Sequence, residues 1–193
     1  GDAVGRRALA LSVLLTFSGR VPALPSRGVV SAGSASISSG AGNTTITQTT
    51  QNAAINWQSF SIGATEAVRF VQPNSNSVML NRVMGSDPSS ILGSLTANGK
   101  VFLMNPNGIL FGQGAQVNVG GLVASTLNMT DADFMAGTYR LSGAGSGSIV
   151  NQGTINADGG YVALLGASVS NQGVISARLG SITLAAGNAM TLD

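Results

Sequence analysis

Residues 148–167 read SIVNQGTINADGGYVALLGA, and residues 168–187 read SVSNQGVISARLGSITLAAG. Eight of these 20 aligned positions are identical, including the Asn-Gln-Gly triplet that each copy carries at the same place. A fixed period near 20 residues is typical of a solenoid, in which one repeat buries its apolar face only against its neighbours. The two copies are therefore expected to be consecutive turns of one coil.

The type of solenoid follows from the length of the apolar runs. These runs are three to five residues long and are separated by Gly, Asn, Ser and Pro, and the Leu-x-x-Leu-x-Leu pattern of leucine-rich repeats is absent. Three short strands in each turn indicate a parallel β-helix. Val162 and Leu164 are expected to point inward, one strand spacing of about 4.8 Å from Ile182 and Leu184.

The composition excludes several classes of function. The chain has 193 residues, 44% of them hydrophobic and 8% charged, with 27 Gly, no His and no Cys. Thiol nucleophiles, Ser-His triads, zinc sites and iron–sulfur clusters are therefore not expected, and we predict no catalytic, metal or cofactor site. The net charge of +2 is small and dispersed, so nucleic acid is not an expected partner.

The amino-terminal residues have the pattern of a secretory signal peptide. Two arginines at 6–7 precede an apolar run at 8–17, which is too short for a bilayer core that needs about 20 residues. Small residues lead up to Ala23, after which cleavage is expected. We therefore predict a signal-peptide-like segment at 1–23 and a β-helix domain at 24–193; a short buried helix is the alternative for the first segment.

Two segments carry large apolar residues on both faces of a strand. They are residues 78–80 and 101–104. Because only one face of a strand can enter the core of a solenoid, we expect extra-helical hairpins or a cap to cover the other face. The alternative is an exposed apolar docking surface, since large exposed apolar patches mark interaction sites.

Three local assignments complete the expected fold. Residues 125–135 have the only helical tendency after residue 26, and Thr130 is a candidate for the amino-terminal cap of a short helix. Trp57 is expected to pack in the core, because a lone aromatic residue in an apolar strand usually does so. The threonine-rich stretch 44–50 is expected to form an early strand of the cap.

The sharpest short motif is Asn105-Pro106-Asn107-Gly108-Ile109. Proline restricts φ to values near −65°, and the Asn-Gly pair that follows tolerates positive φ. The motif predicts a tight turn between two strands in any case. The functional question is whether a partner also recognises this turn.

Other asparagine-rich turns are present as well. Gln72-Pro73-Asn74 is a second turn motif with the same two interpretations. In the repeat, Asn151 is expected to lie over Asn171, where stacked amides hydrogen-bond along the axis of the coil.

Several motifs in a fixed order resemble the amino-terminal secretion domain of the filamentous haemagglutinin family, which is the two-partner secretion (TPS) domain. The resemblance extends over residues 24–193. The matching stretches are AINWQSFSIG (54–63), FVQPN (70–74), LNRV (80–83), ANG (97–99), NPNGILF (105–111) and GGLVAST (120–126).

The resemblance implies an all-β fold: a right-handed parallel β-helix with an amino-terminal cap and extra-helical strands. It also implies export through the periplasm, with recognition by an outer-membrane β-barrel transporter of the Omp85 type through its periplasmic domains. The exported protein then folds at the cell surface or is secreted, commonly as an adhesin. Residues 105–109 match the family's secretion-associated motif, whereas the family's Asn-Pro-Asn-Leu motif has no clean match here.

Two further expectations concern the rest of the protein. The alternative to a secretion domain is a β-helical protein that binds or cleaves polysaccharide. Cleavage, however, needs a pair of carboxylates that point into one site. Only Asp131 and Asp133 are close in sequence, and helix capping explains them better, so we do not expect an enzyme. Residues 181–192 resemble an unfinished turn, which predicts either a longer exoprotein or a paired end. A host-cell or glycan receptor would then bind through the missing carboxyl-terminal part.

Overall fold

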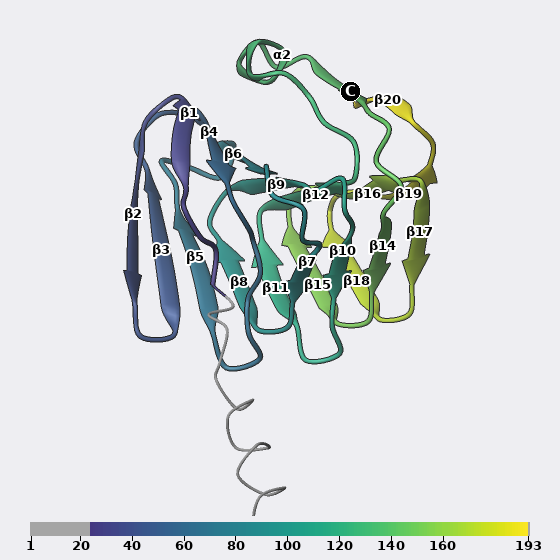
Figure 1. Ribbon diagram of the computed structural model, residues 1–193, viewed down its shortest axis with the longest axis horizontal. Helices are drawn as coiled ribbons and strands as arrows, with labels where there is room; N and C mark the ends of the chain where they lie inside the picture. Colours follow the sequence, from purple (N-terminus) through teal and green to yellow (C-terminus); the bar gives the residue numbers. More distant parts are fainter. Residues whose placement is uncertain (1–23, 193) are drawn as a thin grey trace, which may run out of the picture.

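In the computed structural model, which describes residues 24–192, the chain winds repeatedly through three sheets with short corners between them (Figure 1). Most neighbouring strands within these sheets are parallel and come from successive turns of the coil. The expected parallel β-helix is confirmed. The signal-peptide-like segment 1–23 lies outside the described residues.

The three sheets of the helix are named here sheets 1, 2 and 3. Sheet 1 contains β1 (Val29–Ala32), β4 (Asn52–Trp57), β6 (Val78–Val83), β9 (Lys100–Met104), β12 (Gly121–Ser125), β16 (Val162–Gly166) and β19 (Ile182–Ala186). Sheet 2 contains β2 (Ala35–Gly40), β3 (Asn43–Gln48), β5 (Ala67–Val71), β8 (Ser94–Ala97), β11 (Gln116–Val119), β15 (Thr154–Asp158) and β18 (Val174–Arg178). Sheet 3 contains β7 (Ser89–Ile91), β10 (Ile109–Phe111), β14 (Ser148–Asn151) and β17 (Ser168–Asn171).

The predicted register of the repeat is confirmed. Leu164 pairs with Leu184, and Val162 pairs with Ile182, in the parallel ladder between β16 and β19. Leu164 is fully buried because turns lie on both sides of it. Leu184, at the last described turn, is 45% exposed because no further turn packs against it.

The side chain of Leu164 should therefore be sensitive to truncation. We expect Leu164→Ala to lower the free energy of unfolding by about 2–5 kcal/mol, because the neighbouring turns cannot close the cavity it leaves. Urea denaturation of the purified chain measures this loss. Leu184→Ala is the matched control at the equivalent position one turn later, and a loss as large as that of Leu164→Ala would contradict the burial argument.

The amino-terminal end of the coil is closed by strands that run against the others. β1 pairs antiparallel with β4, and β2 pairs antiparallel with β3, which contains most of the threonine-rich stretch. Trp57 is 1% exposed inside this end, and its Nε1–H donates to Oδ1 of Asn81 at 3.0 Å. The expected cap and the core position of Trp57 are confirmed.

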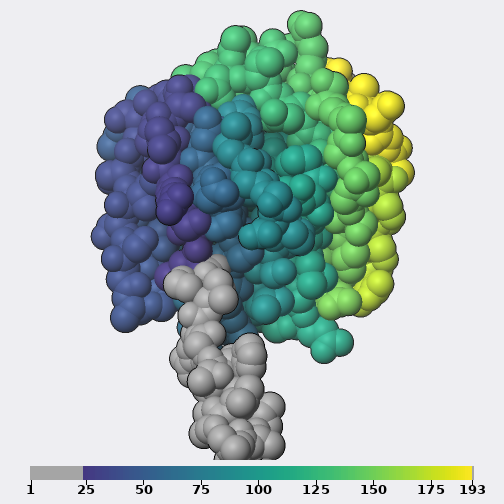
Figure 2. All heavy atoms as spheres, viewed as in Figure 1, coloured from purple at the N-terminus to yellow at the C-terminus, as the bar shows by residue number. Residues whose placement is uncertain are grey.

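The outer face of sheet 1 is covered by a segment that leaves the coil after β12 and returns at β14. This segment, residues 126–147, is called the strap. It contains α2 (Asp131–Met135) and β13 (Tyr139–Ser142), and β13 pairs antiparallel with β20 (Ala189–Leu192). Figure 2 shows the strap in green over one side of the molecule, with the yellow carboxyl-terminal residues beside it.

The strap explains the apolar residues on both faces of the strands. Val78, Leu80, Phe102 and Met104 lie on the outer face of sheet 1 and are at most 3% exposed, because residues of the strap pack on them. The alternative of an exposed docking surface at these positions is wrong. The predicted extra-helical cover is present, but its two strands are distant in sequence and do not form one local hairpin.

The short helix in the strap begins as predicted. Thr130 is its amino-terminal cap, and Thr130 Oγ1 accepts a hydrogen bond from the backbone N–H of Asp133 at 3.1 Å. α2 ends after five residues. No helix within residues 24–192 is long and apolar enough to span a membrane.

The 20-residue spacing is not constant along the coil, although it also occurs between Ser89 and Ile109 in sheet 3. Thr154 pairs with Val174 in sheet 2 at this spacing, whereas Ala67 pairs with Ser94 across a longer turn. The turn from Gln116 to Thr154 is the longest of these because it contains the strap. Insertions at corners leave the strand register intact, since only the strands take part in the ladder.

Candidate functional site

The Asn-Pro-Asn-Gly motif is the corner between β9 of sheet 1 and β10 of sheet 3. The backbone N–H of Gly108 donates to the carbonyl oxygen of Asn105 at 3.2 Å and closes the turn. Gly108 has a φ of 115°, a backbone angle that residues with a Cβ rarely adopt. The predicted tight turn is confirmed, and its glycine is required by the backbone.

The side chain of Asn105 is fully buried and its amide group is paired on both sides. Its Nδ2 donates to the carbonyl oxygen of Asp87 and to Oγ of Ser89, each at 3.0 Å. Its Oδ1 accepts from the backbone N–H and from Nδ2 of Asn107, also at 3.0 Å. In the folded domain the donors and acceptor of this amide are therefore all occupied, and none is free to bind a partner protein.

The other residues of the motif differ in what they contact. Nδ2 of Asn107 also donates to the carbonyl oxygen of Gly85 at 2.9 Å, so both asparagines hold the loop that leads into β7. Ile109 is 2% exposed and belongs to the core. Pro106 is the exposed residue of the turn.

The end of the strap lies directly on this turn. The backbone N–H of Gly147 donates to the carbonyl oxygen of Pro106 at 3.3 Å. A Cβ on Gly147 would overlap the backbone of Asn107 and Gly108, and a Cβ on Gly145 would lie 3.0 Å from Cα of Pro106. The small residues at the end of the strap therefore allow it to cover the turn closely.

The second motif occupies a different corner. Gln72 lies between β5 and β6 and is 5% exposed. Its Nε2 donates to Oε1 of Gln48 at 3.1 Å and to the carbonyl oxygen of Lys100 at 3.0 Å. Its Oε1 accepts from the N–H of Gly99 at 2.9 Å, so this side chain joins three successive turns. Pro73 and Asn74 are exposed.

The structure does not bring the two motifs together. The Gln72 corner precedes a strand of sheet 1, whereas the Asn-Pro-Asn-Gly corner follows one, and these strands run parallel. The motifs therefore lie at opposite ends of the strands of sheet 1. They do not form a single site in the folded domain.

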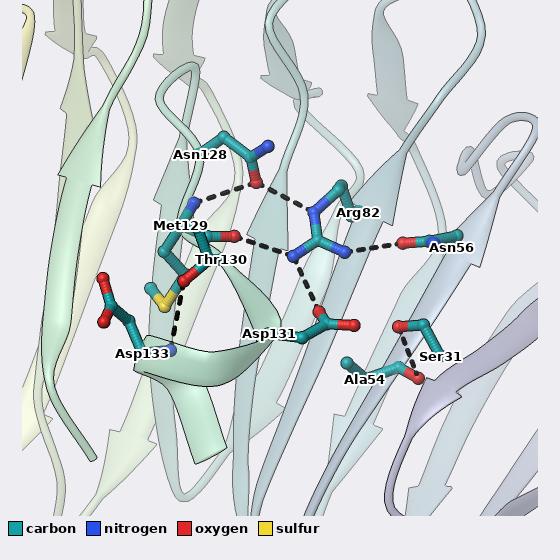
Figure 3. A network of polar contacts seen from close by, with 9 residues as sticks. All are labelled: Ser31, Ala54, Asn56, Arg82, Asn128, Met129, Thr130, Asp131 and Asp133. Atoms are coloured by element: carbon teal, nitrogen blue, oxygen red, sulfur yellow. Dashed lines mark hydrogen bonds and ion pairs between the residues drawn. The ribbon is translucent and has the colours of Figure 1, made fainter. Parts of the chain in front are cut away.

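Arg82 anchors the strap to sheet 1 and was not predicted from the sequence. It projects from the outer face of β6, where Nη1 donates to Oδ1 of Asn56 at 2.7 Å and Nε donates to Oδ1 of Asn128 at 2.9 Å (Figure 3). Nη2 donates to the carbonyl oxygen of Met129 at 2.7 Å and forms an ion pair with Asp131 at 2.9 Å. An arginine inside an apolar strand was the available signal, but its partners in the strap lie more than 40 residues away.

An aromatic cluster forms the middle of the contact between strap and sheet. The ring of Phe102 meets those of Phe134 and Tyr139 edge to face, with centroids 6.0 and 5.0 Å apart. Burial of Tyr139 raises the pKa of its hydroxyl, because the charged form would lose its hydration. The strap is thus held by apolar packing as well as by Arg82.

Comparison with known proteins identifies the family. The family model described as the TPS secretion domain matches residues 23–193. This chain belongs to the TPS secretion domain family. The resemblance found in the sequence motifs is confirmed, and because TPS domains are parts of exported proteins, this domain belongs to an exported protein.

Relatives of the TPS domain come from Haemophilus influenzae. One heme/hemopexin-binding protein is 38% identical over 184 residues, which is 88% of this chain and 20% of the relative. Another is 46% identical over 98 residues, covering 51% of this chain and 11% of the relative. The crystal structure of the HMW1 secretion domain matches with a TM-score of 0.83 and 38% identity, over 86% of this chain and 46% of that chain.

The chain spans about a fifth of the length of the first of these relatives. Membership of the TPS family implies an outer-membrane transporter as the secretion partner. The family is one of secretion domains and not an enzyme family. Within the part of the chain that the structure describes, no three His, Cys, Asp or Glu residues are grouped as metal ligands.

Proposed function

We propose that this TPS domain directs its exoprotein to the transporter through residues 105–109, which the transporter binds before the domain has folded. The observation that supports this proposal is the burial of the Asn105 amide, whose donors and acceptor are all paired within the folded domain. A partner that recognises both asparagines needs a chain in which these bonds have not yet formed.

The partner proposed is an Omp85-type β-barrel whose periplasmic domains bind the unfolded chain. Strand-forming segments of an unfolded chain can add to the edge of a partner's sheet, where backbone hydrogen bonds provide affinity. The exposed tip of the Gln72-Pro73-Asn74 corner is a second candidate element for the same partner. The chain contains no cysteine, so no internal disulfide can trap it in a folded form in the oxidising periplasm.

Folding outside the cell then favours outward movement of the chain through the transporter. Each added turn of the coil buries apolar surface, which stabilises the folded state by about 25 cal/mol per Å². The domain would thereby nucleate folding of the exoprotein at the cell surface. Adhesion, and binding of a host-cell or glycan receptor, are assigned to the part of the exoprotein beyond this chain.

The decisive experiment separates export from stability. We expect Asn105→Ala to reduce the amount of exoprotein outside the cell by about tenfold, with the chain retained in the periplasm. The purified variant should lose about 1–3 kcal/mol of folding free energy, because the partners of the amide are left unsatisfied. Export is measured by immunoblotting of cell fractions, and stability by urea denaturation.

Asn151→Ala is the matched control. Asn151 is also a fully buried corner asparagine, and its Nδ2 donates to Oδ1 of Asn171 at 2.9 Å as predicted. It lies in the next turn of the coil and at the opposite end of the sheet 3 strands from the motif. This variant should lose comparable stability and remain exported. Unchanged export of Asn105→Ala, or equal export defects in the two variants, would contradict recognition of residues 105–109.

A further inference from the structure

We propose that Asn98 and Asn107, each followed by glycine, deamidate in the unfolded chain, that folding of the coil arrests this reaction, and that its product at Asn107 weakens the fold. These are the two Asn-Gly pairs of the sequence, and each lies within one of the motifs that resemble the family. The inference goes beyond the proposed function, because it concerns any period that the chain spends unfolded, whichever residues the transporter binds.

The reaction needs a free backbone nitrogen and a mobile side chain. The glycine nitrogen gives up its proton and attacks Cγ of the asparagine. A bond forms between Cγ and this nitrogen, the bond between Cγ and Nδ2 breaks, and Nδ2 takes up a proton and leaves as ammonia. Water then opens the cyclic imide to give aspartate or isoaspartate. Glycine has no Cβ to block the approach and adopts many backbone conformations, so an unfolded Asn-Gly pair is especially reactive.

The fold holds both reacting groups of the Asn107-Gly108 pair. Nδ2 of Asn107 donates to the carbonyl oxygen of Gly85 at 2.9 Å and to Oδ1 of Asn105 at 3.0 Å. The backbone N–H of Gly108 donates to the carbonyl oxygen of Asn105 at 3.2 Å, and Gly108 is buried. The side chain therefore cannot turn toward the nitrogen, and solvent cannot remove the proton, unless the corner opens.

The Asn98-Gly99 pair is held by a single residue of the preceding turn, Gln72. Nδ2 of Asn98 donates to the carbonyl oxygen of Gln72, and Oδ1 of Asn98 accepts from its backbone N–H, each at 2.8 Å. The N–H of Gly99 donates to Oε1 of Gln72 at 2.9 Å. The side chain of Asn98 is exposed, so its protection comes from these hydrogen bonds and not from burial.

Aspartate at position 107 does not suit the folded corner. An ionised carboxylate accepts hydrogen bonds but cannot donate them. The carbonyl oxygen of Gly85 and Oδ1 of Asn105 would therefore face another acceptor in place of the donor that they now share. Both acceptors lose a bond and the contacts become repulsive, and isoaspartate also lengthens the backbone of the corner. Chains that wait unfolded thus give a less stable domain than chains that fold at once.

The arrest is tested on the purified chain, folded in buffer and unfolded in urea at the same pH. Peptide mapping by mass spectrometry measures the rate of deamidation at each asparagine. We expect both sites to react more slowly in the folded chain by about tenfold or more, since the reaction must wait for local opening. Synthetic peptides of residues 95–101 and 104–110 control for an effect of urea on the chemistry, and should react equally fast in both solutions.

The effect of the product is tested by substitution. Asn107→Asp should shift the midpoint of urea denaturation to a lower urea concentration. Asn76→Asp is the matched control, because it adds the same charge at an exposed asparagine, and it should leave the midpoint unchanged. The wild-type chain provides a second readout: after partial deamidation in urea and return to buffer, the folded fraction should be depleted of chains deamidated at residue 107.

Each part of the proposal has a result that would overturn it. Equal rates at Asn107 in the folded and the unfolded chain would exclude arrest by the fold, and equal rates at Asn98 would show that hydrogen bonds alone do not protect an exposed asparagine. An unchanged midpoint for Asn107→Asp would exclude the effect on stability. None of these results depends on export, so recognition of residues 105–109 is tested separately.

Discussion

Arg82→Ala should lower the free energy of unfolding by about 3 kcal/mol or more, because it leaves several buried acceptors without a donor, each at a cost of about 1–3 kcal/mol. Arg82 is 9% exposed and satisfies acceptors from sheet 1 and from the strap. Without the guanidinium, the carbonyl oxygen of Met129 loses its donor beneath the strap, and the ion pair with the partly exposed Asp131 is lost. Urea denaturation followed by circular dichroism measures the loss.

Two substitutions test this explanation. Arg82→Lys keeps the charge but cannot reach all four acceptors, so it should recover only part of the stability. Arg69→Ala removes an exposed arginine from the outer face of sheet 2 and should change stability by no more than about 0.5 kcal/mol. A loss for Arg82→Ala as small as that for Arg69→Ala would show that the network does not hold the strap.

Phe102→Ala is expected to have an effect of similar size, about 3–5 kcal/mol, through apolar packing instead of charge. Phe102 is fully buried on the outer face of sheet 1 and contacts both aromatic residues of the strap. Its removal leaves a cavity between sheet and strap and also loses the edge-to-face ring contacts. The variant should therefore lose stability and bind a hydrophobic dye more strongly.

The position of Phe102 allows a discriminating control. Phe111→Ala removes an equally buried ring from the interior of the coil and not from beneath the strap. It should cost a comparable amount of stability, but without the accelerated exchange of residues 127–142 that Phe102→Ala should produce. Equal exchange of the strap in both variants would mean that the strap has no separate opening.

The coil itself was predictable because its signals are local. Alternation of inward and outward residues sets the faces of each strand, and the repeat at 148–187 sets which residues lie over one another. Leu164 over Leu184 and Asn151 over Asn171 follow directly from that spacing. The turn at 105–108 was predictable for the same reason, since proline and glycine restrict the backbone at their own positions.

What the sequence determined by itself, then, was the parallel β-helix, its register in the last turns and the position of its corners. The tertiary structure alone decided where the strap lies, that β13 pairs with the distant β20, and that Asn105 has no free hydrogen-bonding group. The physical reason is range: strand periodicity and turn chemistry act over a few residues. The partners of Arg82, by contrast, lie up to 49 residues away and are brought together only when the coil has formed.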